Sequence, residues 1–172
     1  MMTGGTEPQA TLLNRLTLDY SPDEDRMKLT GLTQEGALVI AWLSLRLLGR
    51  LVPHLLTRYE VIATTTGSNN ASLQGTNPST MSDGAEAPVL PQHDTPSFLV
   101  GAADMTQGTD AIVLTLRGES DEVRFAIPSS KMALWLSGLK HLYQAAEWPM
   151  TIWQGADHIL LSAASGGSVT LH

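Results

Sequence analysis

Apolar and polar residues alternate along the first part of the chain, which is the pattern of half-buried β-strands. In residues 12–20 the apolar side chains fall on one face, and the same alternation returns in residues 26–32. Residues 37–43 are apolar almost throughout, which is typical of a strand covered on both faces. Because short turns rich in Pro, Asp, Gln and Gly separate these segments, we expect antiparallel strands.

The period then changes to three or four residues, which predicts an amphipathic helix over 44–59. Ser44 stands at its N-cap position. Pro53 lies inside the pattern and lacks a backbone donor, so either the helix kinks there or it breaks into two pieces. The apolar stripe of the helix comprises Leu45, Leu48, Val52, Leu55, Leu56 and Tyr59.

Residues 64–96 show no periodicity and are rich in Ser, Thr, Asn, Gly and Pro. Such a segment buries too little apolar surface to order itself, so we predict a flexible polar linker. Val89 and Leu90 form a small apolar island within it, and docking of this island on a neighbouring element is the alternative.

After the linker, strand patterns cover 98–105, 111–117 and 123–127, and a second amphipathic helix follows them. After that helix, strand patterns cover 150–153, 158–163 and 169–171. Ser129 or Ser130 stands as the N-cap of the second helix. The apolar stripe of that helix comprises Met132, Trp135, Leu136, Leu139, Leu142, Tyr143 and Ala146.

The two halves of the chain resemble each other. When Met27 is placed on Leu114, apolar residues fall on apolar residues without a gap through both helices. An internal repeat indicates two similar units around one shared core. We therefore predict an α+β fold of two strand-strand-strand-helix units with antiparallel sheet, helices packed on the sheet faces and a C-terminal β-hairpin. The units cover 1–63 and 97–172, with the linker 64–96 between them.

Composition restricts the chemistry and the compartment. The chain has 172 residues, of which 42% are hydrophobic, and no Cys, which excludes disulfides and thiolate sites. The N-terminus lacks a basic segment followed by an apolar one, and no uncharged apolar run reaches the length of a membrane span. We therefore expect a cytoplasmic protein without a membrane partner. The net charge of −7 repels phosphate backbones at long range.

No standard catalytic or phosphate-binding motif occurs in the sequence. His54 and His141 hold equivalent places in the repeat, but two imidazoles without a third ligand do not make a metal site. Asp23, Glu24 and Asp25 crowd one turn without the spacing of a calcium loop, and a solvated acidic turn is the simpler interpretation. We expect no catalytic residues, no metal and no cofactor, and hence no enzyme.

Basic residues recur at every fourth position of the first predicted helix, at Arg46, Arg50, His54 and Arg58. This spacing places them along one side of the helix, in a row that drifts slowly round its axis. In an acidic protein such a stripe favours docking of an acidic partner, although an ordinary solvated helix face has the same pattern. We predict a non-enzymatic assembly or accessory protein that binds another protein, or a second copy of itself, through these four residues. The alternative is a nucleic-acid-binding module that uses the same stripe.

Overall fold

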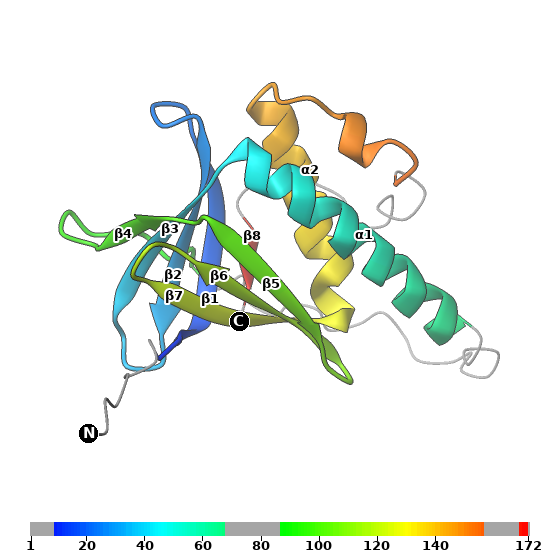
Figure 1. The fold of residues 1–172 in the computed structure, drawn as a ribbon, viewed down its shortest axis with the longest axis horizontal. Coiled ribbons are helices and arrows are strands. Elements are labelled where there is room, and N and C mark those ends of the chain that lie inside the picture. The colour runs from blue at the N-terminus through cyan, green and yellow to red at the C-terminus, as the bar shows by residue number, and fades with distance from the viewer. Residues whose placement is uncertain (1–8, 68–86, 157–168, 172) are drawn as a thin grey trace, which may run out of the picture.

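One mixed β-sheet curls around two helices (Figure 1). The computed structural model describes residues 9–67, 87–156 and 169–171. The elements are β1 Thr11–Ser21, β2 Arg26–Thr33, β3 Leu38–Leu43, α1 Leu45–Gly67, β4 Ser97–Leu99, β5 Ala102–Gln107, β6 Ala111–Arg117, β7 Glu122–Pro128, η1 Ser129–Lys131, α2 Met132–Ala145, η2 Thr151–Trp153 and β8 Val169–Leu171. The strands follow the order β4-β3-β2-β1-β7-β6-β5, and β8 pairs with β1 outside this path. Among the described residues, no helix has the length and apolarity needed to cross a membrane.

The long strand β1 is hydrogen-bonded along both of its edges and joins the two halves of the sheet. One edge pairs antiparallel with β2 over most of its length. The other edge pairs in parallel with β7 at Thr11 and Leu12, and then antiparallel with β8 at residues 16–18. The register with β2 shifts between Leu13 and Arg15, and such an irregularity bends a strand. The bend lets β1 pass from one half of the curled sheet into the other.

The predicted fold of two similar strand-strand-strand-helix units on an antiparallel sheet is wrong. The structure has a single sheet, curled into a half-barrel, and the sheet is mixed because β1 pairs in parallel with β7. The ungapped repeat also fails in the strand pairing. Leu29 pairs with Ala41, but its counterpart Leu116 pairs with Val123 rather than with Pro128. The coarser prediction, a sheet combined with helices in an α+β fold, is confirmed.

The chain after α2 also differs from the prediction. Residues 150–153, expected as a strand, contain the 3₁₀-helix η2. The ring of Trp153 is buried there and packs edge-to-face on Tyr143, with 5.5 Å between ring centroids. Burial of this large indole against the core stabilises a compact turn instead of a strand. β8 lies against β1, and the predicted strand 158–163, which the expected hairpin needs, is outside the described residues.

Helix α1 is continuous through Pro53, so of the two predicted alternatives, a kink or a break, the break does not occur; the helix is also longer than expected. Ser44 caps it as predicted, because its Oγ accepts a hydrogen bond from the Leu47 N–H at 3.2 Å. Pro53 is exposed, whereas Leu48 and Leu55 on either side of it are fully buried. Packing of this stripe offsets the cost of proline inside a helix, which is about 3 kcal/mol.

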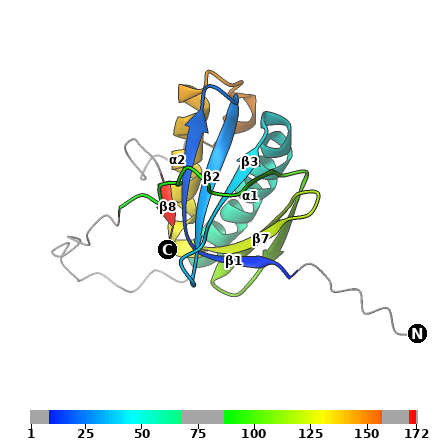
Figure 2. The ribbon, with the colours of Figure 1, turned by 90° about the vertical axis from the view of Figure 1, so that its left-hand side faces the viewer.

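Both helices lie on the same face of the sheet, which we call the inner face; Figure 2 shows β1, β2 and β3 in front of them. The start of α2 has no side-chain cap, so the predicted cap by Ser129 or Ser130 is wrong. One turn of 3₁₀-helix, η1, leads into α2 instead. The core stripe of α2 matches the prediction, with Met132, Trp135, Leu136, Leu139, Leu142 and Tyr143 buried.

Part of the predicted linker 64–96, within residues 87–96, packs on the sheet. Residues 68–86 lie outside the described residues. Val89 is buried on the outer face, and its N–H donates to the Thr17 Oγ1 at 2.8 Å. The carbonyl of Pro96 then accepts a hydrogen bond from β3, and β4 pairs in parallel with β3. The apolar island at Val89 therefore docks, which is the alternative that the sequence left open.

The two ends of the sheet meet at Val100 and Gly101, between β4 and β5. The Val100 N–H donates to the carbonyl of Trp42 at 3.0 Å, and the Gly101 N–H donates to the carbonyl of Arg117 at 2.8 Å. Consecutive amides thus bond to opposite ends of the half-barrel, and the predicted strand 98–105 divides here into two. Beyond this point β5 pairs with β6 alone among the described strands and forms an edge of the sheet.

The inner-face packing of α2 predicts the effect of truncating Leu139. This residue is 0% exposed, whereas Leu134 on the same helix is 50% exposed. We expect Leu139→Ala to lower the free energy of unfolding by about 2–5 kcal/mol, because it removes buried methyl groups and leaves a cavity. The matched control Leu134→Ala should change it by less than about 0.5 kcal/mol. Urea unfolding measures both, and a smaller loss at Leu139 than at Leu134 would show that the helix is rotated from this position.

Candidate docking face on helix α1

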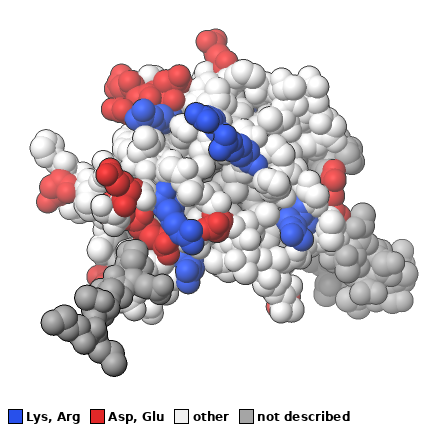
Figure 3. All heavy atoms as spheres, viewed as in Figure 1, with Lys and Arg blue, Asp and Glu red and all other residues white. Residues whose placement is uncertain are grey.

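The four predicted partner-binding residues Arg46, Arg50, His54 and Arg58 lie along one exposed side of α1, and we call this row the α1 basic face. A helix rises about 1.5 Å per residue, so neighbours in the row are about 6 Å apart and the row is about 18 Å long. The opposite side of the helix carries the apolar stripe that anchors it on the core. Figure 3 shows basic side chains along α1, whereas acidic side chains gather around the turn between β1 and β2.

The charge of the α1 basic face is not neutralised by the described part of the chain. No ion pair between described residues involves Arg46 or Arg50. Arg58 donates from Nη1 to the Oε1 of Gln107 at 3.0 Å, and this partner on β5 is neutral. The face therefore keeps its positive charge, and Arg58 is held beside the sheet edge.

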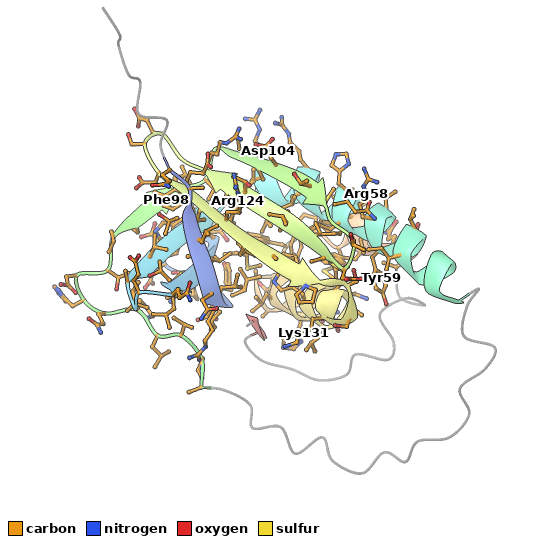
Figure 4. The ribbon with its side chains drawn as sticks, turned by 90° about the horizontal axis from the view of Figure 1, so that it is seen from below. Arg58, Tyr59, Phe98, Asp104, Arg124 and Lys131 are labelled. Carbon is orange, nitrogen blue, oxygen red and sulfur yellow. The ribbon has the colours of Figure 1, made fainter. Side chains whose placement is uncertain are left out.

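The arginines of the sheet differ from those of α1, because acidic residues surround them. Arg117 lies 2.7 Å from Asp104 and 2.9 Å from Glu122. Arg124 lies 3.8 Å from Glu122 and donates from Nε to the Thr115 Oγ1 at 3.2 Å. Figure 4 labels Asp104 and Arg124 in this part of the sheet. Each exposed pair contributes about 0–1 kcal/mol to stability, but together the pairs cancel the charge of this surface.

Asp25 ties the acidic turn to the end of α2. Its Oδ1 accepts hydrogen bonds from the Tyr20 hydroxyl at 2.8 Å and from the Trp148 Nε1 at 2.9 Å. The bond from Trp148, followed by that from Tyr20, lowers the pKa of the Asp25 carboxyl. The bond to Asp25 in turn raises the pKa of Tyr20. Asp23, Glu24 and Asp25 are all exposed, as the predicted solvated turn requires, and Asp25 in addition accepts these two hydrogen bonds.

The histidines and aromatic residues in the described part of the chain form no second cluster of polar groups. His54 and His141 are both exposed, and the described residues contain no group of three or more His, Cys, Asp or Glu that could hold a metal ion. Tyr59, which follows Arg58 in the sequence but lies apart from it in Figure 4, is half-buried. Most of the large aromatic rings are buried, among them Trp135, Tyr143, Trp148 and Trp153. Since stacking on nucleic-acid bases needs exposed rings beside basic residues, the α1 basic face lacks this part of a nucleic-acid site.

Comparison with known proteins gives no relative from which a function can be transferred. No protein-family model matches the chain, and neither the curated proteins nor the solved structures contain a match to it. The function must therefore be argued from the surface. Sequence reasoning missed Gln107 as part of this surface, because it lies 49 positions from Arg58 and no local pattern connects them.

The hydrogen bonds to Asp25 predict a pH dependence of stability. Because its pKa is lowered in the folded protein, its contribution is present above the ordinary carboxyl value and is lost as pH falls through the folded value. We expect the stability advantage of the wild type over Asp25→Asn to shrink between about pH 5 and about pH 2. Asp23→Asn, in the same turn, is the control. Thermal unfolding across this range measures the difference, and an advantage that is constant with pH would contradict the role given to Asp25.

Proposed function

We propose that the chain is a non-enzymatic docking protein that binds an acidic segment of another protein on the α1 basic face. The observation that carries this proposal is the row of exposed arginines, of which Arg46 and Arg50 have no ion-pair partner among the described residues. The chain as a whole has a net charge of −7. Uncompensated basic charge concentrated on one helix of an acidic protein supports a local role in recognition.

Charge alone gives such a face selectivity and a faster encounter, but little affinity. An exposed ion pair contributes about 0.2–1 kcal/mol, so three arginines together contribute about 1–3 kcal/mol. A dissociation constant of about 1 μM requires about 8 kcal/mol. The partner must therefore make further contacts next to α1, beyond those of its acidic side chains.

Two other partners would use the same charge. A nucleic acid is repelled by the net charge of −7, and the aromatic rings that it would stack on are mostly buried. A second copy of the chain offers the exposed side chains of Asp23 and Glu24 in the turn between β1 and β2. Both alternatives are outcomes of the experiment that follows.

Reversal of one charge on the α1 basic face tests the proposal. We expect the wild type to bind fluorescent polyglutamate at low ionic strength, and Arg50→Glu to bind it about five- to thirtyfold more weakly. The change removes an attraction and adds a repulsion, together worth about 1–2 kcal/mol. Lys131→Glu changes the net charge equally at the start of α2, well apart from Arg58 in Figure 4, and should leave binding within about twofold. Fluorescence anisotropy measures the affinities, and circular dichroism verifies the fold of each variant.

The other outcomes separate the alternatives. Equal weakening by Arg50→Glu and Lys131→Glu would show that binding follows net charge and would overturn the proposal. Tighter binding of a single-stranded oligonucleotide than of polyglutamate, with a steep salt dependence, would favour the nucleic-acid module. A wild-type dimer that Arg50→Glu dissociates would show that the partner is a second copy.

A further inference from the structure

The hydrogen bonds of the sheet show which backbone groups of β5 have no partner strand among the described residues. The Gly118 N–H donates to Asp121 at 2.7 Å across the turn from β6 to β7, and the carbonyl of Arg117 accepts from Gly101. Successive residues of β6 bond alternately to β7 and to β5, so Arg117 and every second residue before it bond to β5. Their partners are Ala102, Asp104 and Thr106. The N–H and C=O groups that point away from the sheet therefore belong to Ala103, Met105 and Gln107.

Helix α1 runs beside this edge, and the α1 basic face reaches the edge at Arg58. Helix α1 contacts β5, and the hydrogen bond between Arg58 and Gln107 joins them near the end of the strand. The helix and the strand run in roughly the same direction in Figure 1. The distance from Arg58 back to Arg46 is about 18 Å along the helix axis. The distance from Gln107 back to Ala102 is about 17 Å along the strand, so the row and the edge have matching lengths.

We propose that an extended acidic segment of a partner protein adds to β5 as a further strand, with its acidic side chains on the α1 basic face. This inference rests on the proposed function and specifies the conformation of the partner. On one face of a strand, successive side chains are about 6.7 Å apart. Every fourth residue of a helix recurs after about 6 Å, so acidic residues at alternate positions meet successive basic residues of α1. Backbone hydrogen bonds to β5 then supply the affinity that charge alone does not.

The face of the added strand that points away from α1 should carry uncharged side chains. The charged residue of β5 on that side is Asp104, whose side chain is 54% exposed and paired with Arg117. Because Arg117 already balances the charge of Asp104, acidic side chains on this face would gain no attraction, so the segment should alternate acidic and uncharged residues. A charge on an edge strand also disfavours pairing between two copies of the same edge, which leaves β5 to a different chain.

A peptide of alternating Glu and Thr, long enough to span β5, is the probe. Ala103→Pro removes one outward N–H without removing a bond to β6. We expect it to weaken peptide binding about fivefold or more, the equivalent of about one hydrogen bond. Ala103→Val keeps the N–H and should bind within about twofold of the wild type. Because proline can disturb a strand, two further peptides are tested on the unaltered protein, one N-methylated at every Glu and one at every Thr. One of the two should fail to bind, since its amides face β5.

Several results would overturn the inference. Equal affinity of Ala103→Pro and Ala103→Val, or equal binding of both N-methylated peptides, would exclude strand addition; the docking face would stand if Arg50→Glu still weakens binding. A peptide with all its Glu residues in one block that binds as tightly as the alternating one would exclude the matched spacing. Failure of the wild type to bind the alternating peptide, with polyglutamate binding retained, would overturn the inference but not the proposed function.

Discussion

The pairing of β1 on both of its edges is the interaction on which the rest of the fold depends. Without the parallel pair to β7 at Thr11 and Leu12, the two halves of the sheet would share no strand. Thr17 on the same strand accepts a hydrogen bond from the Val89 N–H. At the far end of β1, Tyr20 donates a hydrogen bond to Asp25, which also accepts one from Trp148, just after α2. β1 thus joins the two halves of the curled sheet, and in this arrangement α1 lies next to β5, which pairs with β6 alone among the described strands.

The arginines of the sheet and those of α1 differ in their charged partners. On the sheet, Arg117 pairs with Asp104 and Glu122, and Arg124 pairs with Glu122, so two carboxylates balance the two arginines. On α1 the row is exposed, and its contact with the sheet is to the neutral side chain of Gln107. The sequence predicted this row, because four-residue spacing on a helix is a local property. It did not predict that the row lies beside β5, because a contact across 49 positions has no local signature.

The same difference between local patterns and contacts of distant residues explains which parts of the fold were predictable. Strand alternation and the helical stripes arise within a few residues, and the expected segments 12–20, 26–32 and 111–117 closely match β1, β2 and β6. The parallel pairing of β1 with β7 joins segments more than a hundred positions apart, so the pattern of each strand alone led to an antiparallel sheet. The division of the strand predicted over 98–105 likewise depends on carbonyls of β3 and β6, which no local pattern reveals. Pro53 predicted a kink or a break because its effect on the backbone is local, whereas the stripe that keeps α1 continuous packs on distant strands.

The central claim is that the face made by α1 and the edge of β5 receives an extended acidic segment, and amide hydrogen exchange tests it most directly. The account predicts that the alternating Glu and Thr peptide slows exchange at Ala103, Met105 and Gln107, whose N–H groups point away from the sheet. Exchange at Asp104 and Thr106, which already bond to β6, should change little. Protection confined to α1, or absent from β5 when the peptide is bound, would contradict the account.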